Sequence, residues 1–444
     1  MAEGLAASFA RFATELRFEE LPAAARAAAA DVLADTVAAM VGGAAEAQPT
    51  ALRAELVGGE GGEGDAVVLA AGLPRVEPGT AAFLNATAGT TLEVDEWHPP
   101  SGHPAVHALP VALALGEAHR AAGPRLLTAL IASYELAAQV EERVELRPGH
   151  HPHGAIGAVA AALGGGLVAG LTPVQIAQAV GIAASMMPVT SYAACYQGAT
   201  VRNAYAGEGA RLAVTAVRLA RAGYSADPLA LEAAIERAAS SADLAAVRPP
   251  EAGEQPQILR NQFKLDAVCG LSLAPLDALR AALAHGLADP AAVRAVRLTV
   301  TPRTTSMDSP RPANDLAAKF SLPYQAAVLM LHGRVDEEAF MPRLLADPEV
   351  AALADRVELR GDEALRDGEA AAVVELSGGG LQEGRCERPR GRFDNPASPS
   401  ALHEKWARLL ARGGVVDPQR ALASFRAAGE VREIGELWNA VETA

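Results

Sequence analysis

The sequence predicts a mostly helical protein with one large all-helical domain and one smaller α/β domain. Hydrophobic residues make up 50% of the chain and aromatic residues only 4%. Abundant alanine favours helices packed at short distances, because small side chains let backbones approach. Helical patterning fills about the first 240 residues, strand-like alternation begins near residue 290, and helical patterning returns near residue 400. We therefore assign residues 1–268 and 400–444 to the helical domain and residues 269–399 to the α/β domain.

Proline and glycine mark the expected helix boundaries. Pro22 suits the first turn of an Ala-rich helix that stops at Gly42 and Gly43. Thr172 and Asp227 are N-cap residue types followed by proline, so each predicts a helix start. The N-terminal segment has charged residues within its apolar run, which predicts an amphipathic helix and not a signal peptide. Further helices are expected over about 80–91, 107–121, 125–143, 155–169, 173–186, 203–222 and 228–240, with a short strand over 66–70.

The α/β domain is expected from alternation of apolar and polar side chains. This pattern is typical of strands with one buried face, and it occurs over residues 293–300, 356–359 and 371–376. Helical runs at about 313–332 and 336–346 lie between these strands. A stretch rich in proline, arginine and glycine, residues 387–396, marks the return to helical patterning.

The charge of the chain limits its partners. A net charge of −15 argues against nucleic acid or an anionic membrane surface, and an anionic substrate would need local cations to capture it. The three cysteines, Cys195, Cys269 and Cys386, show no CxxC spacing, which fits a reducing, cytoplasmic location. Residues 155–171 are uncharged and nearly long enough to span a membrane, but their glycine and alanine content predicts a buried helix.

Histidine is concentrated in two short segments. Six of the ten histidines fall within residues 93–107 and 148–154, and each segment precedes an apolar helix. Proline and glycine in both segments predict loops of fixed conformation. Because histidine titrates near neutrality, two such loops could supply a general base and a general acid. The alternative is two solvated loops with histidines at helix N-termini, and composition alone favours neither.

A metal site is a second interpretation of the first loop. His103 and His107 are four residues apart, close to the acidic residues Glu93, Asp95 and Glu96. However, Pro104 places His103 at the edge of the helix, and no third ligand follows at a standard spacing. We therefore expect no metal. The sequence also has no GxSxG elbow, and the glycines at 164–166 lie in an apolar helix, so they form neither a Rossmann turn nor a P-loop.

Arg202 is a candidate carboxylate-binding residue. It lies just before a predicted helix, where a guanidinium and backbone N–H groups can together hold a carboxylate. The alternatives are an ordinary surface arginine or a structural ion pair with an acidic residue such as Glu208.

Together these motifs resemble the MmgE/PrpD family, which includes 2-methylcitrate dehydratase, cis-aconitate decarboxylase and iminodisuccinate epimerase. Gly-His-Pro-Ala at 102–105 is similar to the family's GHPS/GHPA element, and residues 150–157 resemble its HPTGT-type loop. Residues 202–207, 319–324 and 385–396 are similar to its K-x-L-H-x-G, KFSLPY-like and C-terminal elements. The resemblance runs in family order from about residue 80 to 405, and implies a helical domain completed by the C-terminal tail with an inserted α/β lid domain.

The resemblance places His103, His151 and Tyr324 in the active site, joined by Glu93 or Asp95. Three departures from the family pattern bear on the chemistry. The family's usual lysine is Arg202 here, and an expected histidine four residues before Asp277 is Leu273. The Asp-Asp-Thr before the first loop is replaced by Asp-Glu-Trp at 95–97. Arginine keeps the positive charge but cannot donate a proton, since it is always ionised.

The family's reactions share removal or addition of a proton at a carbon next to a carboxylate. We expect a cofactor-free lyase that hydrates or dehydrates a small di- or tricarboxylic acid, with an epimerase of a small dicarboxylate as the alternative and a catalytically inactive binding protein as the second alternative. His103, His151, Tyr324 and Asp95 are the expected catalytic residues. Arg202, Lys264, Glu93, Trp97 and His153 are expected to bind or enclose the substrate. The resemblance and the small side chains of the helices also favour a homodimer.

Overall fold

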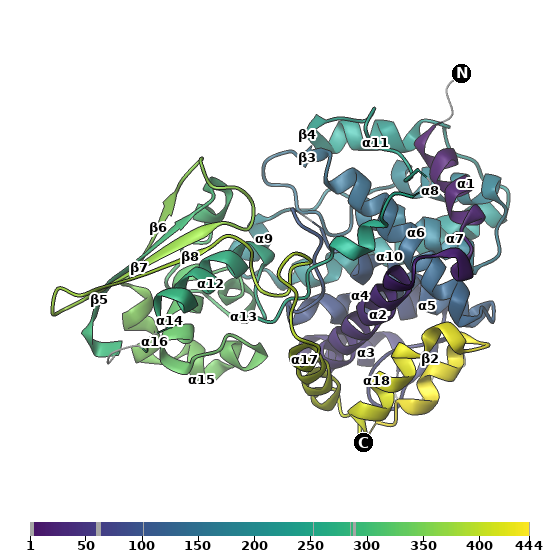
Figure 1. The fold of residues 1–444 in the computed structure, drawn as a ribbon. Helices are drawn as coiled ribbons and strands as arrows, with labels where there is room; N and C mark the ends of the chain where they lie inside the picture. The colour runs from purple at the N-terminus through teal and green to yellow at the C-terminus, as the bar shows by residue number, and fades with distance from the viewer. Residues whose placement is uncertain are drawn as a thin grey trace. The chain divides into compact units, whose positions relative to one another are not determined.

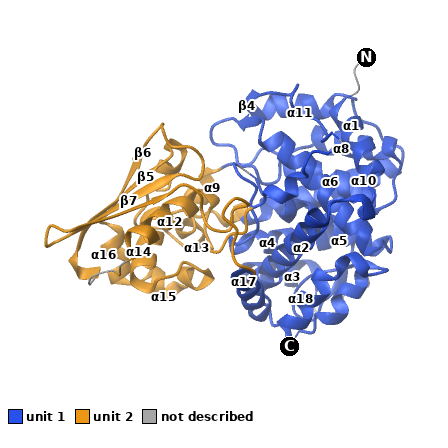
Figure 2. Cartoon of the chain, in the orientation of Figure 1, with its two compact units in different colours: residues 1–191, 203–261, 400–444 blue, residues 192–202, 262–399 orange. Residues whose placement is uncertain are grey.

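The structure is a computed structural model that describes residues 4–58, 64–100, 102–251, 253–284, 286 and 290–443. The chain divides into two compact units (Figure 2). Unit 1 comprises residues 1–191, 203–261 and 400–444, and unit 2 comprises residues 192–202 and 262–399. This division differs from the expected one mainly at residues 192–202, which hold Arg202. Their place in unit 2 is explained partly by a hydrogen bond from Asn314 Nδ2 to the Gly198 carbonyl oxygen, 2.8 Å long.

Unit 1 is all helical apart from short strand pairs (Figure 1). Its central helix, α7 (Ile156–Val168), is buried along its whole length and packs against α5, α6, α8 and α10. The expected mostly helical fold is confirmed. The principal helices are α1 (Leu5–Glu15), α2 (Ala23–Ala44), α3 (Ala47–Val57), α4 (Pro78–Thr91), α5 (Pro104–Ala118), α6 (Gly123–Glu141), α8 (Pro173–Ser185), α10 (Ala204–Arg221), α11 (Ala230–Ala238), α17 (Pro399–Arg412) and α18 (Pro418–Arg426).

Small residues allow these helices to pack closely. A Cβ atom added at Gly164 would lie 2.3 Å from the Ser133 hydroxyl oxygen and 2.8 Å from the Ala129 carbonyl oxygen, both on α6. The glycines at 164–166 therefore serve packing. Among the described residues, α2 is the helix long and apolar enough to cross a membrane, and 83% of its most apolar window is buried inside the protein.

One of the two helix starts expected from N-cap residues was confirmed, and the other was wrong. Thr172 caps α8 with a complete capping box, in which Gln175 is the reciprocal partner. In contrast, α11 begins at Ala230, because the Asp227 carboxylate instead accepts a hydrogen bond from the Leu229 N–H, 2.8 Å long, within a turn. The strand expected over 66–70 is limited to β1 (Ala66–Val67), which pairs with β2 (Arg75–Val76).

Unit 2 contains a four-stranded mixed sheet in the order β6-β5-β7-β8. The strands are β5 (Val293–Val300), β6 (Val357–Gly361), β7 (Ala370–Leu376) and β8 (Leu381–Cys386). β5 pairs in parallel with β6 and antiparallel with β7, which pairs antiparallel with β8. Helix α12 (Leu273–Ala282) packs on β7 and β8, so close to β8 that a Cβ at Gly384 would lie 2.2 Å from the Ala278 carbonyl oxygen.

The helical run expected over 313–332 is interrupted in unit 2. It forms α13 (Asp315–Ala318) and α14 (Leu322–His332), because Ser321 is extended and its hydroxyl oxygen caps α14 by accepting the Tyr324 N–H. The run expected over 336–346 is likewise divided into a 3₁₀ turn and α15 (Pro342–Leu345). Helix α16 (Pro348–Ala354) and strand β8 were not predicted.

A buried ion pair fixes the C-terminal tail to the rest of unit 1. The Lys405 ammonium group, on α17, donates hydrogen bonds to the carboxylate of Asp35, on α2, and to the carbonyl oxygen of Val94, the latter 2.8 Å long. The Trp406 indole N–H donates to the same Asp35 carboxylate at 2.7 Å. Burial raises the pKa of Asp35, an effect that the charge of Lys405 opposes. Asp35 and Lys405 thus lie far apart in the sequence but neutralise each other's charge.

We predict that Lys405→Met lowers the free energy of unfolding by about 3–5 kcal/mol, because it leaves the Asp35 carboxylate buried without this cation. Denaturant unfolding monitored by circular dichroism measures the loss. The double variant Asp35→Leu/Lys405→Met should recover most of it, since removal of both charges removes the desolvation penalty. Arg248→Met is the control, because its pair with Glu254 is exposed and should contribute less than about 1 kcal/mol. A Lys405→Met loss no larger than the control's would contradict this role.

Candidate active site

The loop between α4 and α5 carries the acidic residues and the first of the two histidines expected to be catalytic. Asp95 is fully buried and Glu93 is 1% exposed, while Trp97 and His103 are 9% and 8% exposed. Glu93 adopts a left-handed conformation with φ of 57°, which is uncommon for a residue with a side chain. The bond from Lys405 to the Val94 carbonyl oxygen anchors the loop directly beside Asp95.

His103 is oriented by two oxygen atoms. Its Nδ1 atom lies 2.7 Å from Asp95 Oδ2 and 3.0 Å from the carbonyl oxygen of Glu96. Because both neighbours are acceptors, Nδ1 must carry the proton, and in the neutral ring Nε2 is then the basic nitrogen. His103 is also the N-cap residue of α5, as the position of Pro104 predicted. The arrangement suits a general base whose protonated form is stabilised by the Asp95 carboxylate.

His107 has a structural role. Its Nδ1 donates to the carbonyl oxygen of His103 at 2.9 Å, and its Nε2 accepts the backbone N–H of Gly154 at 3.1 Å. The ring packs against Gly157, where an added Cβ would lie 2.3 Å from His107 Cγ. Both nitrogens are therefore used in joining the two histidine loops, so the alternative in which His103 and His107 together hold a metal is wrong.

The second histidine loop is fixed by its own backbone and by Thr190. His151 Nδ1 accepts the backbone N–H of His153 at 3.0 Å, so its proton is on Nε2 in the neutral ring. The Thr190 hydroxyl lies 3.0 and 2.9 Å from the carbonyl oxygens of His151 and His153, and the His151 N–H donates to the Thr190 carbonyl oxygen. His151 is thereby presented as a proton donor, the opposite of His103.

The two loops meet at His153, which lies between the other imidazoles. Its ring centroid is 4.6 Å from that of His103 and 4.9 Å from that of His151. His103 and His151 therefore come together, as expected, and His153 is the fully buried residue between them. His103 and His151 both belong to unit 1.

Two buried carboxyl groups that the sequence did not assign to the active site support the first loop. Glu96 accepts the backbone N–H of Ala105 at 2.8 Å and the Tyr134 hydroxyl at 3.0 Å, which ties the loop to α5 and α6. Burial raises the pKa of Glu96 to about 8. Burial also raises the pKa of Glu141, whose carboxyl group packs against Gly102 so closely that a Cβ there would lie 1.8 Å from Oε2. For Glu141, the available signal was an acidic residue at the end of a helix that is otherwise mostly apolar.

Arg202 lies in unit 2, immediately before α10. It is 1% exposed, and its guanidinium carbon is 5.2 Å from the centroid of the Phe320 ring. The alternative of an ordinary surface arginine is therefore wrong. Pairing with Glu208 is not supported either, since the Glu208 carboxylate is exposed and pairs with Arg211.

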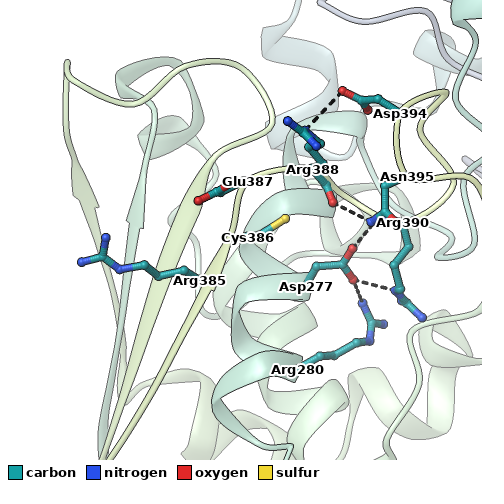
Figure 3. Close-up of a pocket in the computed structure, with 9 residues that line it drawn as sticks. All are labelled: Asp277, Arg280, Arg385, Cys386, Glu387, Arg388, Arg390, Asp394 and Asn395. Atoms are coloured by element: carbon teal, nitrogen blue, oxygen red, sulfur yellow. Dashed lines mark hydrogen bonds and ion pairs between the residues drawn. The ribbon is translucent and has the colours of Figure 1, made fainter.

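Lys264 is fully buried in unit 2, in a segment held by the stretch rich in proline, arginine and glycine. The Phe263 N–H donates to the Gly391 carbonyl oxygen at 2.9 Å, and Gln262 forms a bridge with Arg392. Arg280 and Arg390 converge on Asp277 (Figure 3), with nitrogen–oxygen distances of 2.9 and 2.8 Å to its carboxylate. These residues line a pocket of about 430 Å³. The same arginines also pair with Asp266, so the cluster fixes the backbone next to Lys264.

Tyr324 and Leu273 are also in unit 2. The Tyr324 hydroxyl donates to the carbonyl oxygen of Ala339 at 2.6 Å, and burial raises its pKa. The hydroxyl thus already has a partner in its own unit. Leu273, which stands where the family pattern has a histidine, is buried at the start of α12 and offers no group for proton transfer.

Comparison with known proteins identifies the family of the chain. Residues 7–239 match the MmgE/PrpD N-terminal domain and residues 267–428 match the MmgE/PrpD C-terminal domain. A similar protein, the cis-aconitate decarboxylase-like protein oryM of Aspergillus oryzae (strain ATCC 42149 / RIB 40), is 26% identical over 388 residues, which is 78% of each chain. Since the two domain matches cover most of the sequence, the chain belongs to the MmgE/PrpD family.

Proposed function

We propose that the protein is a cofactor-free lyase that hydrates or dehydrates a small di- or tricarboxylic acid. Family membership and the cis-aconitate decarboxylase-like relative support an enzyme of the lyase or dehydratase type. The observation that carries the proposal is the contact of His103 Nδ1 with Asp95 Oδ2, 2.7 Å long, within a buried group of imidazoles. A carboxylate beside one imidazole nitrogen leaves the other as a base for abstracting a proton from carbon.

In this mechanism, His103 Nε2 removes the proton next to a substrate carboxylate. The Asp95 carboxylate stabilises the imidazolium that forms, as a buried carboxylate does in other carboxylate–histidine pairs. The Nε2–H of His151 donates a hydrogen bond to the departing hydroxyl group, which leaves as water with the proton that His103 took from carbon. Arg202 and Lys264 are the proposed partners of the substrate carboxylates, which a chain of net charge −15 would otherwise repel.

An epimerase is the second candidate function, and the opposite tautomers of His103 and His151 favour it. One ring nitrogen that accepts a proton and another that carries one are what inversion at a carbon centre requires, with the proton gained by His103 returning to His151 between turnovers. Leu273 and Arg202, which replace a histidine and a lysine of the family pattern, are the features that favour an inactive binding protein instead.

A proton NMR time course with small di- and tricarboxylates in deuterated water distinguishes these functions. For a lyase we expect a new alkene signal, or loss of one in the reverse direction. For an epimerase we expect deuterium uptake at the carbon next to the carboxylate without net conversion. If no carboxylate in the panel exchanges or reacts, although several bind, the inactive binding protein is the better description.

We predict that Asp95→Asn lowers kcat by roughly 10²–10⁴-fold with a small change in KM, because the imidazolium at His103 loses its stabilising charge. Steady-state kinetics on the substrate found by NMR measures the effect. Asp243→Asn, an exposed turn residue, is the matched control and should leave kcat unchanged. An Asp95→Asn enzyme that is folded and retains full kcat would remove Asp95 and His103 from the proposed base.

We predict that Arg202→Ala weakens transition-state or substrate binding by roughly 2–4 kcal/mol, the cost of removing one partner of a desolvated charge pair. Arg202→Lys should retain part of the binding, since a lysine cannot reproduce the two-pronged contact. Arg211→Ala, on the exposed face of α10, is the control. If Arg202→Ala lowers the melting temperature but leaves KM and kcat/KM unchanged, Arg202 is a structural residue and the clamp must lie at Lys264 or elsewhere in the lid.

A further inference from the structure

The folded chain brings together three potential metal ligands that are separated in the sequence. One ligand atom from each of Asp95, His103 and His153 lies within 4.8 Å of the others, and all three residues are buried. The sequence argued against a metal because no third ligand follows His103 at a standard spacing. The second histidine loop supplies that ligand, since His153 packs against His103 with ring centroids 4.6 Å apart.

The chemistry of these donors selects a class of ion. Two imidazoles and one carboxylate suit borderline divalent transition ions such as Zn²⁺, which bind nitrogen and oxygen ligands at about 2.0–2.2 Å. Ca²⁺ and Mg²⁺ prefer sites built from oxygen atoms alone and are poorly matched. We propose that Asp95, His103 and His153 form a binding site for Zn²⁺ or a similar ion, and that occupation of this site inhibits the enzyme.

The three ligands are held in place without an ion. His103 is fixed through its carbonyl oxygen by His107, and the carbonyl oxygen of His153 accepts a hydrogen bond from Thr190. Asp95 follows Val94, whose carbonyl oxygen accepts a hydrogen bond from the Lys405 ammonium group. Neighbours that orient the ligands of a metal in this way strengthen binding, because little order has to be created when the ion arrives.

Inhibition follows from the identity of the ligands. Asp95 Oδ2 and His103 Nδ1 are 2.7 Å apart with a proton on Nδ1. An ion bound by both atoms takes the place of that proton, and the neutral ring then carries its proton on Nε2, so Nε2 no longer has a lone pair with which to act as the base. The inhibitory part of the proposal rests on the proposed function, whereas the binding part does not, so the two are tested separately.

Binding is tested first, by isothermal titration of the full chain with Zn²⁺ after removal of metals with EDTA. We expect one Zn²⁺ per chain, with the affinity reduced by about 100-fold or more in His153→Ala, since even residues that only orient ligands contribute 10–100-fold. His119→Ala is the matched control, because His119 lies at the exposed opposite end of α5. X-ray absorption of the zinc complex should show nitrogen and oxygen ligands only, without the Zn–S distance of about 2.3 Å that binding to a cysteine would give.

Zinc binding that is absent, that is unchanged in His153→Ala, or that involves sulfur would overturn the proposed site. Activity is tested second. We expect EDTA to leave the rate unchanged and Zn²⁺ to lower it in proportion to the occupancy measured by titration. Zinc that binds at this site without lowering the rate would overturn the inhibition alone. Activity that is lost in EDTA and restored by Zn²⁺ would overturn both the inhibition and the proposed cofactor-free reaction, while leaving the site itself in place.

Discussion

Burial of carboxyl groups is the constraint on which the rest of unit 1 depends. Asp35, Asp95, Glu96 and Glu141 all lie inside a helical unit, where an ionised carboxylate is costly without compensation. Lys405 and Trp406 satisfy Asp35, while Ala105 and Tyr134 satisfy Glu96. Burial also raises the pKa values of Glu96 and Glu141, which lowers the number of negative charges that the interior must hold near neutrality. Of these four carboxyl groups, Asp95 is the one that contacts an imidazole, the ring of His103.

The histidines of the two loops divide structural and chemical roles through their hydrogen bonds. His107 uses both ring nitrogens to connect the loops, so it stabilises the site and is not available for proton transfer. His103 uses Nδ1 as a donor, and His151 uses Nδ1 as an acceptor. Residues of one type within two short segments therefore take opposite tautomers in the neutral ring. The backbone geometry of the loops, and not their composition, determines which histidine carries its proton on Nδ1 and which on Nε2.

The sequence was sufficient for the fold and for the two histidine loops, but not for the contacts within and between those loops. A long uncharged run located α7 closely, and the alternation of apolar and polar side chains located β5. These patterns did not locate the break at Ser321, where one capping hydroxyl outweighs helical propensity, nor the turn at Asp227. The structural role of His107 depends on Gly154, and the neutralisation of Asp35 depends on Lys405, almost the whole chain away. Pairings of this kind are determined by tertiary packing and cannot be deduced from spacing.

The proposed reaction depends most directly on the tautomer of His103. Nitrogen-15 NMR of the chain labelled at histidine reports which ring nitrogen carries the proton, and the variants His103→Gln and His151→Gln assign the signals. At a pH where imidazoles are neutral, we expect His103 to be protonated at Nδ1 and His151 at Nε2, as their neighbours require. A His103 ring protonated at Nε2 would contradict the account, because the nitrogen proposed as the base could not then accept a proton.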